Sequence, residues 1–233
     1  PITQQVVLAT AGAAGAGDAT YVDDVFSTYV YEGSNSSQSI NNGIDLSGEG
    51  GLVWIKNRDN TSDHAFYDTE RGATKQLISN STGAEQTNSL FSSFNSNGFT
   101  IAGNSNVVSR SGYDYTSWTF RKAPGFFDVV TYTGNGSNRT IAHNLGSVPG
   151  MIFIKRYSAT EDWTCYHRSL GATHYVQLNL TDHARDLNLI FNDTEPTSSV
   201  FTVGTHDRVN TNGESYVAYL FAHDDQSFGT NGD

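Results

Sequence analysis

One stretch of this sequence occurs twice. Residues 51–74, GLVWIKNRDNTSDHAFYDTERGAT, return as residues 150–173, GMIFIKRYSATEDWTCYHRSLGAT, with no insertion or deletion between them. Lys56 aligns with Lys155, and the whole stretch keeps a constant spacing of 99 residues. A repeated segment indicates a repeated structural unit, so this feature limits the possible folds more than any other. We infer a duplicated domain.

The similarity continues outward from this stretch. Residues 25–40 match residues 126–141, and residues 115–120 match residues 216–221, both at a spacing of 101. The spacing changes only inside Gly-, Ser- and Asn-rich segments, where loops absorb differences in length. The sequence therefore predicts four parts: a leader (1–24), a first repeat (25–124), a second repeat (125–225) and a C-terminal junction (226–233).

The composition and the spacing of turn residues predict an all-β fold. The chain has 12 Tyr and 13 Phe, and short apolar or alternating runs are separated by Gly-Asn and Asn-Gly steps. About eight short strands in each repeat indicate two tandem antiparallel β-sandwiches of a jelly-roll-like type. In the second repeat we expect strands at residues 127–132, 140–144, 151–156, 163–167, 174–180, 187–191, 201–204 and 216–222, with equivalents in the first.

The connection between the repeats is short. Lys122-Ala123-Pro124-Gly125 ends one repeat, and the next apolar run starts at once with Phe126. We expect such a junction to fix the two domains against each other and to produce a rod. In the leader, residues 11–17 are a low-complexity Ala/Gly run, and residues 6–9 are a candidate edge strand. The leader is either an attachment or oligomerisation segment, with Val6, Val7 and Leu8 as the candidate assembly residues, or a flexible linker.

Charge and cysteine content exclude several classes of partner. A net charge of −11 and a pI near 4.9 disfavour binding to nucleic acid or to an anionic membrane. No apolar run is long enough to span a bilayer. The single cysteine, Cys165, excludes an internal disulfide framework and a Cys-rich metal site. Since it aligns with Phe66, we expect a buried thiol.

No catalytic motif stands out. The chain has no G-x-S-x-G elbow, no HExxH or HxH spacing, and no phosphate-binding loop followed by a helix and a lysine. The acidic pairs Asp23-Asp24, Glu161-Asp162 and Asp224-Asp225 are adjacent in sequence, so on a strand their side chains point to opposite faces. We expect no enzymatic activity, no cofactor and no metal.

The aromatic residues suggest one candidate binding surface. Trp54 aligns with Phe153 and Trp118 with Tyr219, inside strand runs, so we expect both tryptophans in the core. Trp163 aligns with His64 and could be a surface aromatic that stacks on a sugar ring; the alternative is packing against the strand end. The candidate surface for a glycan or a partner comprises Trp163, Tyr166, His167, His206 and Asp207.

Both repeats also share a lysine and an aspartate. Lys56 and Asp63 in the first repeat correspond to Lys155 and Asp162 in the second, on either side of an expected hairpin. A cross-strand ion pair is one interpretation, worth about 0–1 kcal/mol if exposed. Contact with a polar ligand is the other.

Several segments together resemble a repeated domain of tail-fibre-like structural proteins of tailed bacteriophages, notably those of marine and cyanobacterial hosts. They include FFDVVTYTGNGSNRTIAHNLGSVPGMIFIKR, DWTCYHRSLGAT and SYVAYLFAHDD in the second repeat and GLVWIKNR, DTERGAT and SWTFRKAPG in the first. The resemblance implies a virion protein, commonly a homotrimer, which attaches to other tail, portal-vertex or capsid proteins through its N-terminal part. It also implies that further domains can follow Asp233.

Two functions are consistent with these features. The first is a non-enzymatic structural component of a phage virion, the N-terminal part of a tail fibre that supports host adsorption. The alternative is a carbohydrate-binding module for host surface polysaccharide, or such a module associated with a depolymerase. Glycan binding predicts exposed aromatic side chains on a loop-bearing face. A pure spacer predicts that Trp54, Trp118 and Trp163 are all buried.

Overall fold

The computed structural model of the protein describes residues 20–223. The first half begins with one helical turn, and nine antiparallel strands follow it. These elements are α1 (Val22–Val25), β1 (Phe26–Glu32), β2 (Gln38–Asn41), β3 (Gly51–Asn57), β4 (Ala65–Asp68), β5 (Lys75–Ile78), β6 (Gln86–Thr87), β7 (Phe91–Asn95), β8 (Gly98–Ile101) and β9 (Asp114–Arg121).

The second half repeats this order with two short helices added. Its elements are β10 (Phe127–Thr133), β11 (Arg139–Ala142), β12 (Pro149–Arg156), β13 (Thr164–His167), β14 (His174–Gln177), β15 (Arg185–Asp186), α2 (Asn188–Phe191), β16 (Val200–Val203), α3 (Asp207–Asn210) and β17 (Ser215–Ala222). The candidate edge strand at residues 6–9 and the assembly segment Val6, Val7 and Leu8 lie outside the described residues.

The sheets confirm an all-β fold made of antiparallel sandwiches. A six-stranded sheet in the first half has the order β1-β9-β3-β4-β5-β6, and the second half has the equivalent order β10-β17-β12-β13-β14-β15. Each large sheet is covered by a smaller one, β2-β8-β7 in the first half and β11-β16 in the second. No sheet of residues 20–223 contains strands from both halves, so each half builds its own sandwich.

One expected strand is a helix in the second half. Residues 187–191 were predicted as a strand, but α2 occupies Asn188–Phe191, where the first half has β7. The prediction is wrong because Asn192 ends the segment in the left-handed conformation, with φ of 52°, and its backbone N–H bonds back to the Asn188 carbonyl. Ile190 and Phe191 still bury their side chains, so the helical turn replaces the strand as a cover for the core.

Each sandwich has its own apolar core between its two sheets. In the first half this core includes Tyr31, Val53, Tyr67, Phe91 and Phe99. The second half has the equivalent set, which includes Tyr132, Ile152, Tyr166, Phe191 and Phe201. Since side chains alternate across a strand, the neighbours of these residues point to the other face of each large sheet, which we call the outer face.

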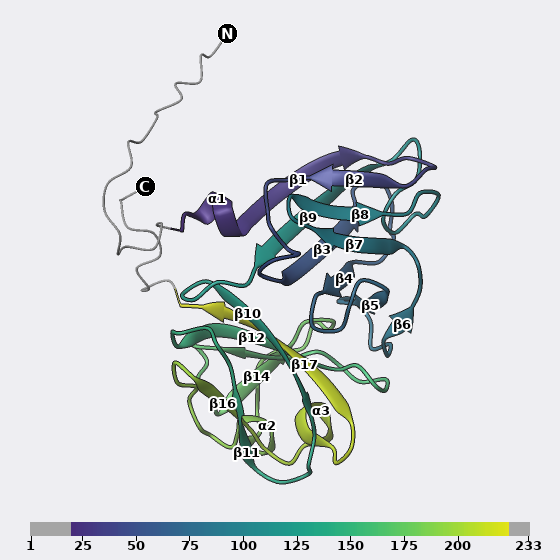
Figure 1. The fold of residues 1–233 in the computed structure, drawn as a ribbon. Coiled ribbons are helices and arrows are strands. Elements are labelled where there is room, and N and C mark those ends of the chain that lie inside the picture. Colours follow the sequence, from purple (N-terminus) through teal and green to yellow (C-terminus); the bar gives the residue numbers. More distant parts are fainter. Residues whose placement is uncertain (1–19, 224–233) are drawn as a thin grey trace, which may run out of the picture.

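A third core joins the two halves. It consists of outer-face residues of both large sheets, such as Leu52, Phe66 and Leu77 from the first and Phe153 and Tyr219 from the second. Figure 1 shows the two sandwiches stacked, with β10, β12 and β17 on the side of the second half that meets the first. The outer faces therefore pack against each other, and the short junction holds the halves face to face.

The lysine and aspartate shared by both repeats close a hairpin loop. Lys56 donates to the carbonyls of Asn57 and Asn60, at 2.6 and 3.0 Å. Asp63 accepts instead from the Asn80 side chain at 2.9 Å, and Asp162 from Asn179 at 2.8 Å. The expected cross-strand ion pair is therefore wrong, because loop carbonyls accept from the lysine and an asparagine at the equivalent position of each repeat donates to the aspartate. Asp162 is also paired with Arg208, at 3.2 Å.

Candidate functional site

A buried ionic network lies where the two halves meet. Arg71 contacts Asp68 at 2.6 Å and Glu85 at 3.1 Å, and the side chains of Arg71 and Asp68 are no more than 1% exposed. From the second half, the Tyr219 hydroxyl donates to Asp68 at 2.7 Å, and Arg71 donates to the same hydroxyl at 3.3 Å. The guanidinium also lies over the ring of Tyr157, 5.9 Å from its centroid.

Electrostatics keep this network charged. Burial acts to lower the pKa of Arg71, but the adjacent Asp68 carboxylate outweighs it, so the pKa is raised. Burial also raises the pKa of Tyr219 well above its ordinary value, so its hydroxyl remains a donor. A buried charge that loses its partner costs several kcal/mol, and the two halves are therefore locked in one arrangement.

Two donors of the second half complete this interface. The Trp163 ring nitrogen donates to the Ile78 carbonyl at 3.0 Å. The Lys155 ammonium donates to the carbonyls of Thr82 and Glu161, at 3.0 and 2.7 Å. Burial lowers the pKa of Lys155 to about 8. The loop that contains Thr82 is thus held by side chains from the opposite half.

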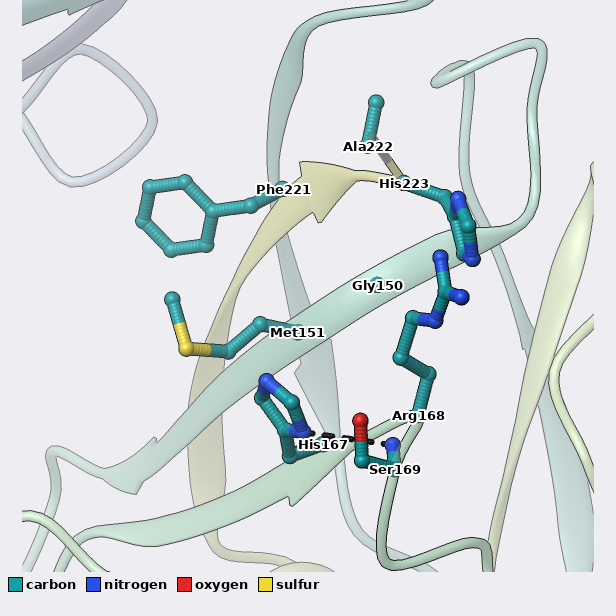
Figure 2. Close-up of a pocket in the computed structure, with 8 residues that line it drawn as sticks. All are labelled: Gly150, Met151, His167, Arg168, Ser169, Phe221, Ala222 and His223. Carbon is teal, nitrogen blue, oxygen red and sulfur yellow. Dashed lines mark hydrogen bonds between the residues drawn. The ribbon is translucent and has the colours of Figure 1, made fainter. Parts of the chain in front are cut away.

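A hollow of about 360 Å³ opens on the outer face of the second half, at the ends of β12, β13 and β17. Figure 2 shows its lining, in which Met151, Phe221 and His167 lie on one side and Arg168 and His223 on the other. The His167 Nδ1 atom accepts from the backbone N–H of Ser169 at 3.2 Å, which fixes the ring. The hollow combines an apolar wall with basic and hydroxyl groups.

A second hollow of about 360 Å³ adjoins the first, because Met151 and His167 line both. Its floor and walls are otherwise almost entirely apolar, with Phe153, Leu170, Val176 and Leu178 among them. Cys165 lies in the floor, and burial raises the pKa of its thiol to about 12. The predicted buried thiol is confirmed, and at neutral pH it is a protonated apolar group.

Two of the predicted binding residues are buried. Trp163 is 0% exposed in the core between the halves, which contradicts the surface aromatic and agrees with the alternative of a packed side chain, although it packs against the first half. Tyr166 is 2% exposed in the core of the second sandwich, where its hydroxyl contacts Glu195 at 2.6 Å. Trp163 is buried because the first half covers it. Tyr166 is buried because side chains alternate along a strand, so its ring points to the inner side of the sheet.

The three other candidates are at the surface, but in separate places. His167 lines both hollows. His206 precedes α3, where its Nδ1 accepts from the Arg208 backbone at 3.2 Å, and the exposed Asp207 follows it. The structure therefore does not bring the five candidate residues together as one binding surface.

The two remaining tryptophans are only half buried. Trp54 and Trp118 lie on the outer face of the first half, with ring centroids 5.2 Å apart. Trp54 packs against the edge of the core between the halves, so the prediction that both tryptophans are core residues is confirmed only in part. The Trp54 ring nitrogen donates to His64 Nδ1 at 3.1 Å. Burial and the nearby Lys56 lower the pKa of His64, so its neutral ring carries the proton on Nε2. The counterparts of these tryptophans, Phe153 and Tyr219, are covered by the first half.

Residues 20–223 hold no cluster of three or more His, Cys, Asp or Glu side chains that could bind a metal ion. Within the same range, no helix is long and apolar enough to cross a membrane.

Sequence reasoning missed the ionic network and the half-buried tryptophans. A signal for the network was present, because the two repeats differ in charge where it forms. Asp68, Arg71 and Glu85 correspond to His167, Leu170 and Ala184. Such differences within a duplication mark positions where the two copies have different neighbours.

Comparison with known proteins gives a family but no activity. A protein-family model described as "Domain of unknown function (DUF7483)" matches residues 22–230. The chain belongs to this DUF7483 family. The match runs through both repeats, so the paired sandwiches together correspond to the DUF7483 domain. No curated protein and no solved structure matches the chain.

Proposed function

We propose that the chain is a rigid structural module of a fibre-like virion protein, and that its paired sandwiches hold other parts of the particle at a fixed spacing. The observation that carries the proposal is the interface between the repeats, which combines a shared apolar core with the network of Asp68, Arg71, Glu85 and Tyr219. A spacer must keep its two ends at a fixed distance under load, and such an interface prevents the two domains from moving relative to each other. The sequence resemblance to tail-fibre-like proteins supplies the context.

The mechanical part of the proposal is tested by unfolding the full chain in urea and following tryptophan fluorescence and circular dichroism. We expect one transition that coincides for both probes. Arg71→Leu leaves two carboxylates without their cation, and should lower the free energy of unfolding by about 3–5 kcal/mol. The matched control Leu170→Ala alters the equivalent, 37% exposed position and should cost less than about 1 kcal/mol. Two separate transitions in the unaltered chain would overturn the rigid module.

The virion part of the proposal needs the particle itself. Mass spectrometry of purified particles of the virus that encodes this chain should detect it in a constant ratio to the other structural proteins. Its presence in the lysate but not in the particles would contradict a structural role. Homotrimer formation and attachment to tail, portal-vertex or capsid proteins belong to the same proposal, and cross-linking of the particles would identify the contacts.

We place binding of a host polysaccharide second. Trp163 and Tyr166, the aromatics expected to stack on sugar rings, are buried. The half-buried pair Trp54 and Trp118 is the aromatic surface that favours this alternative. A glycan array probed with the full chain tests it, and signals that Trp54→Ala removes would support it.

A further inference from the structure

The part of the outer face that is open in one repeat is equivalent to the part that is buried in the other repeat. We call the open surface of the second half the free edge; it consists of the loops that follow β13 and β14 and the exposed His167 at the end of β13, beside the already buried Cys165. Leu170 and Leu180 there are 37% and 43% exposed. The open surface of the first half is the free face, the part of the outer side of β1, β9 and β3 that the second half leaves uncovered. One end of that side, with Leu52 and Phe120, already packs in the core between the halves. The free face carries Thr28, Trp54 and Trp118.

Each open surface aligns, repeat against repeat, with one of the two surfaces that form the contact between the halves. In the first half, the equivalent of the free edge carries Phe66 and Leu77, both 0% exposed. In the second half, the equivalent of the free face carries Val129 and Tyr219, also 0% exposed. Most of the contact between the halves is therefore head-to-tail, and each end of the pair keeps most of one equivalent surface unused. The two surfaces overlap only where the equivalent residues Phe120 and Phe221 meet, with ring centroids 5.4 Å apart.

The hydrogen-bonding groups of the interface recur on the open surfaces. Inside the chain, Lys155 reaches the Thr82 carbonyl, and Trp163 reaches the Ile78 carbonyl. On the free face, Lys56 takes the place of Lys155, and His64 takes that of Trp163, with its Nε2–H as the donor. On the free edge, Thr181 and Gln177 occupy the positions of Thr82 and Ile78 and supply the equivalent carbonyls.

Both open surfaces lack the charged and hydroxyl groups that form the ionic network on the covered surfaces. The free edge has His167, Leu170 and Ala184 where the covered edge has Asp68, Arg71 and Glu85, and the free face has Trp118 where the covered face has Tyr219. The ionic network is thus missing from both surfaces at once, and an apolar hollow of about 360 Å³ replaces it. A contact between the free edge and the free face would bury aromatic and aliphatic groups without leaving a member of that network unpaired.

We propose that the free edge of one chain docks on the free face of a second copy of this chain and reproduces the interface between the repeats. The proposal stands independently of the virion assignment, since it follows from the equivalence of the surfaces. A contact of this kind is heterologous, so chains add in one direction and form either a closed ring or an open row.

The test is the mass of the full chain by sedimentation velocity and light scattering over a wide range of concentrations. We expect species larger than one chain to grow with concentration. Leu170→Arg puts an unpaired charge into the free edge, and Thr28→Arg puts one beside Trp118 in the free face. Both side chains are exposed, so both variants should fold, and each should lose assembly. Leu189→Arg, at a 44% exposed position of α2, is the matched control and should assemble normally.

Mixing the two variants gives the sharpest result. A Leu170→Arg chain keeps an intact free face and a Thr28→Arg chain keeps an intact free edge, so the mixture should form one-to-one pairs and nothing larger. Three outcomes would overturn the proposal: a monomer at every concentration, assembly that survives both variants, or a mixture that stays monomeric. A monomer that binds glycans through Trp54 would assign the free face to sugars instead.

Discussion

In the first repeat, the outer face of the large sheet is buried over β4 and β5 and open around Thr28 of β1. In the second repeat, the outer face is buried over β10 and β17 and open at the loops that follow β13 and β14. Phe66 and Leu77 are 0% exposed in the first case, and Val129 and Tyr219 in the second. The same fold thus has two different environments. A duplicated position acquires its role from what covers it, and not from its place in the repeat.

The largest contrast is expected between Trp163 and its counterpart His64. Trp163→Ala removes a fully buried ring that also donates to Ile78, so the free energy of unfolding should fall by about 3–5 kcal/mol. His64 is half exposed, and His64→Ala should cost less than about 1 kcal/mol. Urea denaturation measures both values. Equal losses would mean that the two outer faces are covered to the same extent.

Tyr219 and Trp118 form the next pair. Tyr219→Phe keeps the ring but removes the hydroxyl that donates to Asp68, and a buried carboxylate that loses a donor costs about 1–3 kcal/mol. Trp118→Phe, at the equivalent position on the open face, should change stability by less than about 1 kcal/mol. If Tyr219→Phe is neutral, the hydroxyl does not hold the halves together.

Lys155 and Lys56 should differ in their response to pH. The pKa of Lys155 is about 8 in the folded protein and near its ordinary value of 10.5 in the unfolded chain. Between these values the unfolded chain binds more protons at this lysine, so the contribution of Lys155 to stability should rise as the pH increases from about 8 to 10, by on the order of 1 kcal/mol. Lys155→Met should remove this rise and Lys56→Met should retain it. Because the raised pKa of the Cys165 thiol lowers stability over the same pH range in both proteins, the measured quantity is the difference between the unaltered protein and Lys155→Met at each pH. A difference that does not change with pH would contradict the burial of Lys155.

The smallest expected effect is on the chemical reactivity of the Cys165 thiol. Cys165 is 3% exposed and the pKa of its thiol is about 12, so the folded protein should react with iodoacetamide at pH 8 far more slowly than the chain in urea. Peptide mass spectrometry after timed quenching measures the modified fraction. Rapid modification of the folded chain would show that the floor of the free edge opens to solvent.

The repeat itself made much of the fold predictable. Alternating apolar residues and turn signals are local properties, and their recurrence at a spacing near 99 residues predicted two antiparallel sandwiches with equivalent strands. Local reasoning was wrong at residues 187–191, where the left-handed Asn192 favours a helical turn over a strand. A single residue's backbone conformation decided that segment.

The sequence by itself determined the duplication, the all-β class and the buried thiol, because each depends on local pattern or on the alignment of one repeat with the other. Only the tertiary structure decided which half of each outer face is covered. Trp163 is fully buried and Trp118 half exposed although both are large aromatics at a sheet surface. Their burial depends on how two distant sheets pack, and that arrangement is fixed by Asp68, Arg71 and Glu85 meeting Tyr219, residues that come together only in the folded chain.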